Sequence, residues 1–279
     1  MPHFIFQARQ GRKRFRAVGA TAFAVVAAGM LVTLVGAAAA ASRPVPLGTA
    51  NSFAVLAGSG ITNTGPTTIT GDLGTYATTS MTGTNQLTIH GTNHAGDSVT
   101  KGAKNDLVTA YNTAAGKGPT IAIVDDLGGH TLVPGVYNSA SSIGLTGTLT
   151  LDAKGNKNAA FIFQAGSTLT TASASRVKLI NGAQACNVYW QIGSSATLGT
   201  YSHLRGTILA MQSITLTTGA TVVGRVLARV GAVTLDTNTI TRPTCAATKK
   251  HSPTPHKTHH GHGTNSTAHT ARHHVGLTG

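Results

Sequence analysis

Three short stretches of the sequence decide the fold: Tyr189-Trp190-Gln191-Ile192-Gly193, Thr207-Ile208-Leu209-Ala210-Met211 and Arg225-Val226-Leu227-Ala228-Arg229. Behind them runs a second series, Ala196-Thr197-Leu198, Ile214-Thr215-Leu216 and Val233-Thr234-Leu235, and the members of both series recur every 18 to 19 residues. The stretches are short and rich in β-branched and apolar residues, as strands are. Two strand series with one period predict the stacked coils of a β-solenoid with about three faces. A sandwich or a barrel does not require such matching spacings.

One segment departs from this pattern of strands and turns. Apolar residues recur there at helical spacing: Val99, Ala103, Leu107, Ala110, Tyr111 and Ala114. Asp97 or Ser98 precedes them as a possible N-cap, and Gly116 and Pro119 follow. We therefore expect one helix over 97–115, lying along apolar solenoid surface. The stacked coils should bury side chains such as Phe161, Phe163, Trp190, Leu209 and Leu227.

The N-terminus is typical of an export signal. A basic region ends at Arg16, an uncharged run spans Ala17 to Ala41, and Ala39-Ala40-Ala41 provides a pattern for cleavage. We expect a signal peptide over 1–41, a short linker over 42–46, a solenoid domain over 47–245 and a secreted protein. The alternative is an uncleaved membrane anchor, since the uncharged run is long enough to span a bilayer. No second apolar run of that length follows.

The last segment, residues 246–279, is rich in His, Thr, Gly and Pro and has no apolar pattern, which predicts disorder. It holds eight of the 13 His residues. Such a tract can bind Zn, Ni or Cu, or serve as a solvated linker whose charge rises below about pH 6.5; we favour the linker. His90 and His94 with Asp97 resemble part of a metal site, but polar caps are common where a strand meets a helix. We therefore predict no metal site and no cofactor.

The charge of the chain lies mainly at its ends. The formal net charge is +14, but residues 44–245 hold eleven Lys and Arg against seven Asp, a net of +4. No basic stripe interleaved with aromatic residues is visible, so nucleic acid is not an expected partner. The chain has no Glu, and its seven acidic residues are scattered except for Asp125 and Asp126. Acid–base catalysis usually needs a positioned carboxylate or His, so we expect no enzyme, and a carbohydrate-active β-helix is disfavoured.

The two cysteines, Cys186 and Cys245, agree with export. In an oxidising compartment they are expected to form a disulfide. The bridge would close a loop of about 60 residues and stabilise the fold by roughly 4 kcal/mol in the chain-entropy model. A two-cysteine metal site without nearby ligands is the weaker alternative.

Threonine dominates the turns and strands. Three quartets share a Thr-Gly-x-Thr/Asn pattern: Thr64-Gly65-Pro66-Thr67, Thr82-Gly83-Thr84-Asn85 and Thr218-Gly219-Ala220-Thr221. Thr-x-Thr pairs occur as Thr68/Thr70, Thr148/Thr150 and Thr215/Thr217. Residues two apart on a strand point the same way about 6.6–6.8 Å apart, and neighbouring coils lie about 4.7–4.9 Å apart. Stacked threonines would form a regular grid of methyls and hydroxyls that can order surface water. The alternative is that Thr and Gly simply suit strands and tight turns.

Longer segments resemble a known family. The segments Leu127–Tyr137, Ala160–Leu169, Gly224–Ala228 and Asp236–Ile240 are similar, in this order, to those of the DUF3494 ice-binding proteins. The resemblance covers about residues 45–245. It implies a right-handed, discontinuous β-helix of triangular section with one long helix alongside, and ice binding through one flat face without cofactor or metal. The pair Cys186 and Cys245 looks like that of actinobacterial members.

The resemblance gives the quartets a role. As ice-contacting residues we predict Thr64, Thr67, Thr82, Asn85, Thr218 and Thr221. Other coils depart from the quartet pattern, as at 146–149 and 194–197. The first hypothesis is therefore a secreted protein that adsorbs to ice and inhibits its growth or recrystallisation. The alternative is an extracellular adhesion or envelope module on the same solenoid, with the basic tail touching anionic cell-wall polymers.

Overall fold

The computed structural model describes residues 43–123 and 126–245. The predicted signal peptide and the predicted tail lie outside the described residues, so these two segments and the domain boundaries drawn from them stay predictions. Within the described residues no helix is long and apolar enough to cross a membrane.

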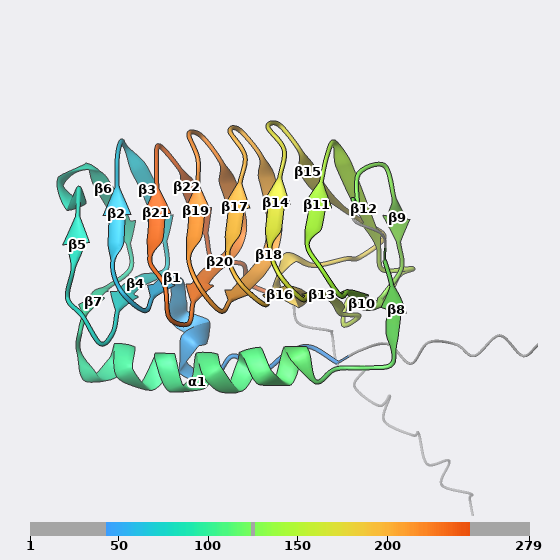
Figure 1. Cartoon of the computed structure of the whole chain (residues 1–279), viewed down its shortest axis with the longest axis horizontal. Coiled ribbons are helices and arrows are strands. Elements are labelled where there is room, and N and C mark those ends of the chain that lie inside the picture. The colour runs from blue at the N-terminus through green and yellow to red at the C-terminus, as the bar shows by residue number, and fades with distance from the viewer. Residues whose placement is uncertain (1–42, 124–125, 246–279) are drawn as a thin grey trace, which may run out of the picture. The chain divides into compact units, whose positions relative to one another are not determined.

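The described chain is a solenoid whose strands pair in parallel and form three faces (Figure 1). The threonine face is a seven-stranded sheet in the order β11 (Ile143–Leu145), β14 (Leu169–Thr171), β17 (Ala196–Leu198), β19 (Ile214–Leu216), β21 (Val233–Leu235), β2 (Ile61–Asn63) and β5 (Met81–Thr82). The two predicted strand series fall on different faces, in the register Tyr189–Thr207–Arg225 and Ala196–Ile214–Val233. The predicted solenoid is confirmed.

A second, 15-stranded sheet covers the other two faces. The helix face consists of β8 (Thr120–Ala122), β10 (Gly135–Ser139), β13 (Phe161–Ala165), β16 (Val188–Ile192), the ends of β18 (His203–Ala210) and β20 (Thr221–Ala228), and β1 (Phe53–Ala57), β4 (Asp72–Thr75) and β7 (Asn93–Ala95). The third face consists of β9 (Thr131–Leu132), β12 (Thr148–Asp152), β15 (Arg176–Ile180), the beginnings of β18 and β20, and β22 (Thr239–Thr241), β3 (Thr67–Thr70) and β6 (Leu87–His90).

Strands β18 and β20 belong to both of these faces because each runs around a corner. The corner is built on Gly206, whose φ is +114°, and on Gly224, stacked beside it. A Cβ on Gly224 would lie 1.7 Å from the carbonyl oxygen of Gly206. Only glycine permits this backbone approach.

The coils do not stack in chain order. The first coils dock beyond the last one: β1 pairs with β20, β2 with β21 and β3 with β22. Figure 1 accordingly places the blue strands beside the red ones. The chain then returns along the solenoid through α1 (Ser98–Ala115) to begin the remaining coils at β8. This is the discontinuous order that the family resemblance implied.

Apolar side chains from all three faces fill the interior. Tyr137, Phe163 and Trp190 occupy the same register position in successive coils, and their rings stack at centroid distances of 5.5 and 4.1 Å. The indole Nε1 of Trp190 donates to the carbonyl oxygen of Arg205 at 3.0 Å. Stacking in register means that each ring covers the next, so no coil buries its core alone.

Helix α1 matches the predicted segment. Asp97 is its N-cap and accepts from the Thr100 backbone N–H at 2.8 Å, and Gly116 follows its last residue. Its buried stripe includes Ala103, Leu107 and Tyr111, which pack in one cluster with side chains of the helix face. Polar side chains fix its position as well. Gln164 Nε2 donates to the carbonyls of Ala114, Ala115 and Lys117.

Lys104 makes a second polar anchor for the helix. It is 9% exposed, and its Nζ donates to the carbonyl oxygens of Ala228 and Arg229 at 2.6 and 2.5 Å. Burial, followed by the charge of Arg229, lowers the Lys104 pKa to about 8.

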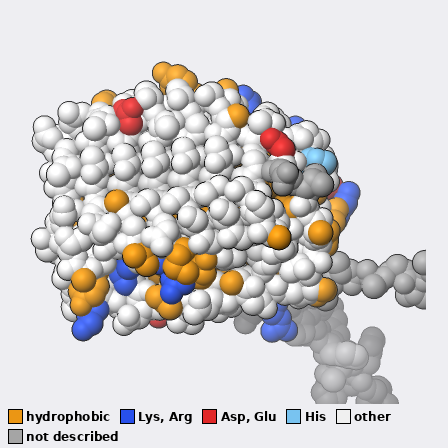
Figure 2. All heavy atoms as spheres, viewed as in Figure 1, with side chains coloured by type: hydrophobic (Ala, Val, Ile, Leu, Met, Phe, Trp, Pro, Cys, Tyr) orange, Lys and Arg blue, Asp and Glu red, His pale blue; other side chains and the backbone are white. Residues whose placement is uncertain are grey.

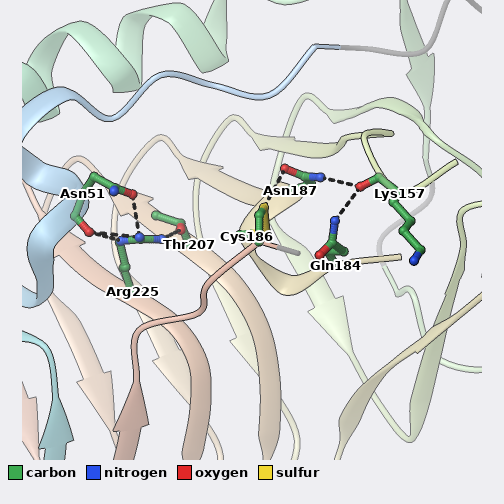
Figure 3. The surroundings of a disulfide bond; sticks show 8 residues. Asn51, Lys157, Gln184, Cys186, Asn187, Thr207 and Arg225 are labelled. Carbon is green, nitrogen blue, oxygen red and sulfur yellow. Dashed lines mark hydrogen bonds between the residues drawn. A yellow bond between two sulfur atoms is a disulfide. The ribbon is translucent and has the colours of Figure 1, made fainter. Parts of the chain in front are cut away.

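Cys186 and Cys245 form the predicted disulfide (Figure 3). Cys186 lies in the short 3-10 helix Ala185–Asn187, and the two Cα atoms are 5.8 Å apart. Next to the bridge, Gln184 and Asn187 donate to the Lys157 carbonyl at 2.8 and 3.0 Å. The bond therefore ties the segment that follows β22 to the 3-10 helix that precedes β16.

Candidate functional site

A ladder of threonines runs along the threonine face. Each of its strands presents one residue outward, and the register aligns these residues across neighbouring coils. In spatial order the ladder is Thr170, Thr197, Thr215, Thr234, Thr62 and Thr82, with Gly144 at one end. The threonines are exposed or half-exposed, while the residues beside them in the strands point mostly into the core. The ladder spacing is therefore the strand spacing, about 4.8 Å.

The rest of this face is small and uncharged. None of its seven strands contains a charged residue. In each coil, the residue two positions before the outward-facing one is also small. These residues are Ser142, Thr168, Ser195, Ser213, Ala232, Gly60 and Ser80. In the space-filling view a mostly white band covers these strands, and the coloured side chains gather below it, over the helix, and at its edges (Figure 2). Because these small side chains stand on neighbouring strands of one sheet, the surface they form is flat. Threonine is β-branched and therefore stiff at χ1, so its methyl and hydroxyl groups are held in fixed positions.

The two other faces offer no comparable surface. Helix α1 covers much of the helix face. The third face continues threonine columns on β3 and β22, but on β15 and β18 the same positions hold Arg176, Lys178, His203 and Arg205. Long charged side chains interrupt its flatness.

The six ice-contacting residues predicted from the quartets do not lie together on one face of the structure. Thr82 lies on the ladder. Thr64 and Thr218 are exposed just after their strands, where the chain leaves the threonine face, and Thr218 Oγ1 donates to Asp236. Asn85 is exposed in the 3-10 helix Thr84–Gln86.

The other two lie elsewhere. Thr221 begins β20 on the third face, and its Oγ1 lies 2.7 Å from His203 Nδ1. Thr67 is 1% exposed, and its Oγ1 accepts from the Asn238 backbone N–H at 3.0 Å. A side chain so buried supports the turn from inside and presents no surface.

The glycines explain why the quartets spread in this way. Gly65, Gly83 and Gly219 all have positive φ, from +68° to +129°. A Cβ on Gly83 would lie 1.8 Å from the Asn63 carbonyl oxygen. The quartets are thus the corners of coils, and their four residues turn from one face to the next. Five of the six ladder threonines lie outside the predicted set. Three of these five could have been found from the sequence, because Thr197, Thr215 and Thr234 are the middle residues of the triplets in the second strand series.

The acidic side chains of the described residues accept structural hydrogen bonds. Thr100 and His94 lower the pKa of Asp97, Thr49 lowers that of Asp106, and Lys154 lowers that of Asp152 to about 2. For Asp126, burial raises the pKa, but hydrogen bonds from Gly128 and Thr146 outweigh it and the net shift is downward. A general acid needs a pKa near the working pH, and these shifts run the other way.

The described residues contain no group of three or more His, Cys, Asp or Glu that could hold a metal ion. Of the residues considered for a partial metal site, His94 Nδ1 lies 2.6 Å from Asp97 Oδ2, at the N-cap of the helix. His90 lies on the third face, paired in register with Thr70.

Comparison with known proteins identifies relatives of the chain. A family model described as ice-binding-like matches residues 55–241. The chain is 53% identical over 196 residues to an ice-binding protein of Nostoc sp. (strain HG1), covering 70% of this chain and 72% of that protein. It is 37% identical to an ice-binding protein of Colwellia sp, covering 74% and 87%. Among solved structures, an ice binding protein from an Antarctic biological consortium matches with a TM-score of 0.72 and 48% identity, covering 73% of this chain and 93% of that one.

Proposed function

The chain belongs to the ice-binding-like protein family, and on that premise we propose that it adsorbs to ice through its threonine face. Adsorbed protein would inhibit the growth or recrystallisation of ice. The action is binding, without chemical conversion of a substrate. Relatives named as ice-binding proteins, among them the solved structure at 48% identity, support this function.

The observation that carries the proposal is the ladder of six threonines in unbroken register. A single hydroxyl has one donor and two acceptor lone pairs and holds water weakly. An array whose spacing is set by the backbone holds many waters at once, in positions that repeat with the coils. Ordered waters can bridge to a surface at little entropic cost. A flat, uncharged, periodic surface therefore suits a solid whose own surface is periodic.

The proposed ice-contacting residues are Thr62, Thr82, Thr170, Thr197, Thr215 and Thr234. Thr64, Thr218 and Asn85, predicted from the quartets, border this face and extend the proposed contact. Thr221, around the corner, would take part only if contact continues onto the third face.

We also propose that the protein acts outside the cell. The basic segment ending at Arg16, the uncharged run to Ala41 and the Cys186–Cys245 disulfide support export. An adhesion or envelope module without ice activity is not favoured, since the relatives carry ice binding in their names.

Single ice crystals growing in a solution of the purified protein test this function. We expect faceted crystals whose growth halts within a range of temperatures below melting. A boiled sample of the same protein is the control for solute effects. Crystals that stay round and grow as freely as in that control would refute ice binding.

A further inference from the structure

The third face contains a groove that ice binding does not use. Strands β15 and β18 start side by side, with Arg176 paired to His203. β18 then turns the corner at Gly206, while β15 continues to Ile180. The strands separate, and a groove of about 770 Å³ lies along them. Its lining includes Arg176, Lys178 and Arg205 together with the apolar side chains of Leu179, Ala183 and Val223.

Within the described residues, the three cations of this groove have no acidic partner. The ion pairs among the described residues are His94–Asp97 and Lys154–Asp152, and neither involves the groove. Arg176, Lys178 and Arg205 are all exposed. Arg176 and Lys178 lie two residues apart on β15, about 6.7 Å along one side of the strand, and Arg205 lies on the strand that starts beside it. Three like charges on one groove repel one another, so folding alone does not account for the arrangement.

We propose that this groove binds a linear phosphate polymer. Guanidinium groups match phosphate oxygens bidentately, and an ammonium adds a mobile point charge. Among the described residues no Phe, Tyr or Trp lines the groove, and His203 is its one aromatic side chain. A single ring cannot stack successive bases, so recognition rests on the charged backbone of the ligand. The lining residues extend over three strands, β15, β18 and β20, which gives room for a chain-like ligand.

The location of the groove leaves the threonine face free. Apart from Ala183, which follows β15, the groove residues belong to β15, β18 and β20 on the third face, and the ladder belongs to the other sheet. A protein held by its third face can therefore still present the ladder to ice. The groove does not depend on the proposed ice activity, and each can be lost without the other.

The experiment measures binding of the full chain to a fluorescent abasic phosphodiester oligomer, which has phosphates but no bases. The test variant replaces all three cations: Arg176→Gln, Lys178→Gln and Arg205→Gln. A matched control, Lys101→Gln, Lys117→Gln and Lys157→Gln, removes the same charge from residues outside the groove. Fluorescence anisotropy over a series of KCl concentrations gives the affinity and its salt dependence, and thermal melting verifies that both variants fold.

In the test variant we expect the slope of log affinity against log salt to become shallower by about 2, since each phosphate contact of a single strand contributes roughly 0.7. The control should keep the wild-type slope, and both variants should keep the wild-type ice activity. Equal losses in the two variants would overturn the proposal, because the effect would then follow net charge. Unchanged binding in the test variant, or tighter binding of polygalacturonate than of the phosphate oligomer, would also overturn it.

Discussion

Replacing Thr215 by tyrosine should break the threonine ladder without disturbing the core. Thr215 is third in the spatial order of six, between Thr197 and Thr234. A phenol ring there stands above the neighbouring hydroxyls and divides the ladder into runs of two and three. The longest continuous run thus falls from six threonines to three. If each aligned hydroxyl contributes about 1 kcal/mol, as a net hydrogen bond does, adsorption weakens by about 3 kcal/mol, or roughly 100-fold.

The fold should tolerate this change. The Thr215 side chain points outward, and exposed substitutions usually alter the free energy of unfolding by less than about 0.5 kcal/mol. Recrystallisation inhibition, measured as the lowest effective concentration, should deteriorate while the melting temperature stays within about 2 °C. The control is Thr239→Tyr, which adds the same ring to an exposed threonine on the third face. Thr221→Tyr tests whether contact with ice continues around the corner. Wild-type inhibition by Thr215→Tyr, or an equal loss in Thr239→Tyr, would refute the assignment of the face.

Three further predictions concern stability and the end of the chain. The double substitution Cys186→Ser and Cys245→Ser should lower the free energy of unfolding by about 4 kcal/mol, because the bridge closes a loop of 59 residues. Denaturant titration measures this change, and a loss below about 1 kcal/mol would contradict the prediction. The lowered Lys104 pKa means that the unfolded chain holds this proton more tightly, so stability should rise as pH increases from about 8 to about 10.5. Lys104→Met should flatten that rise in pH-dependent melting, and an identical profile would refute the role of Lys104. A chain ending at Cys245 should keep its ice activity, since the ladder precedes that residue; a folded truncation without activity would show that the tail contributes.

The periodic half of the fold could be predicted because its coils repeat. Tyr189, Thr207 and Arg225 carry matching strands at a constant spacing, and the structure stacks them in that register. Helix α1 was equally clear, since Ala103, Leu107 and Ala110 are spaced for one buried stripe. The position of the first coils could not be obtained in this way. Residues 53–95 share no spacing with the later repeats, and only long-range packing places them beyond β20.

The candidate face was the harder prediction, for a physical reason. The Thr-Gly-x-Thr/Asn quartets are conspicuous, but their glycines have positive φ and mark corners, so Thr67 turns inward and Thr221 reaches another face. The ladder follows instead from strand alternation: a threonine between two inward-facing apolar residues must point out. The triplets centred on Thr197, Thr215 and Thr234 have that pattern. The register between coils decides which outward-facing threonines share one face. The sequence of a single strand does not reveal that register.

The stacking order of the coils has a consequence for the chain as it is synthesised. Thr62 and Thr82 emerge early, but the neighbour that joins them to the ladder, Thr234, emerges more than 150 residues later. Until then β1 and β2 lack the strands that cover them on one side, and an uncovered strand edge invites pairing with another chain. Closing contacts of such long sequence separation is slow. The complete surface thus forms late, and a ribosome that stops before β21 releases a chain with a divided ladder. Such a chain presents at most three aligned threonines, Thr170, Thr197 and Thr215, in place of six.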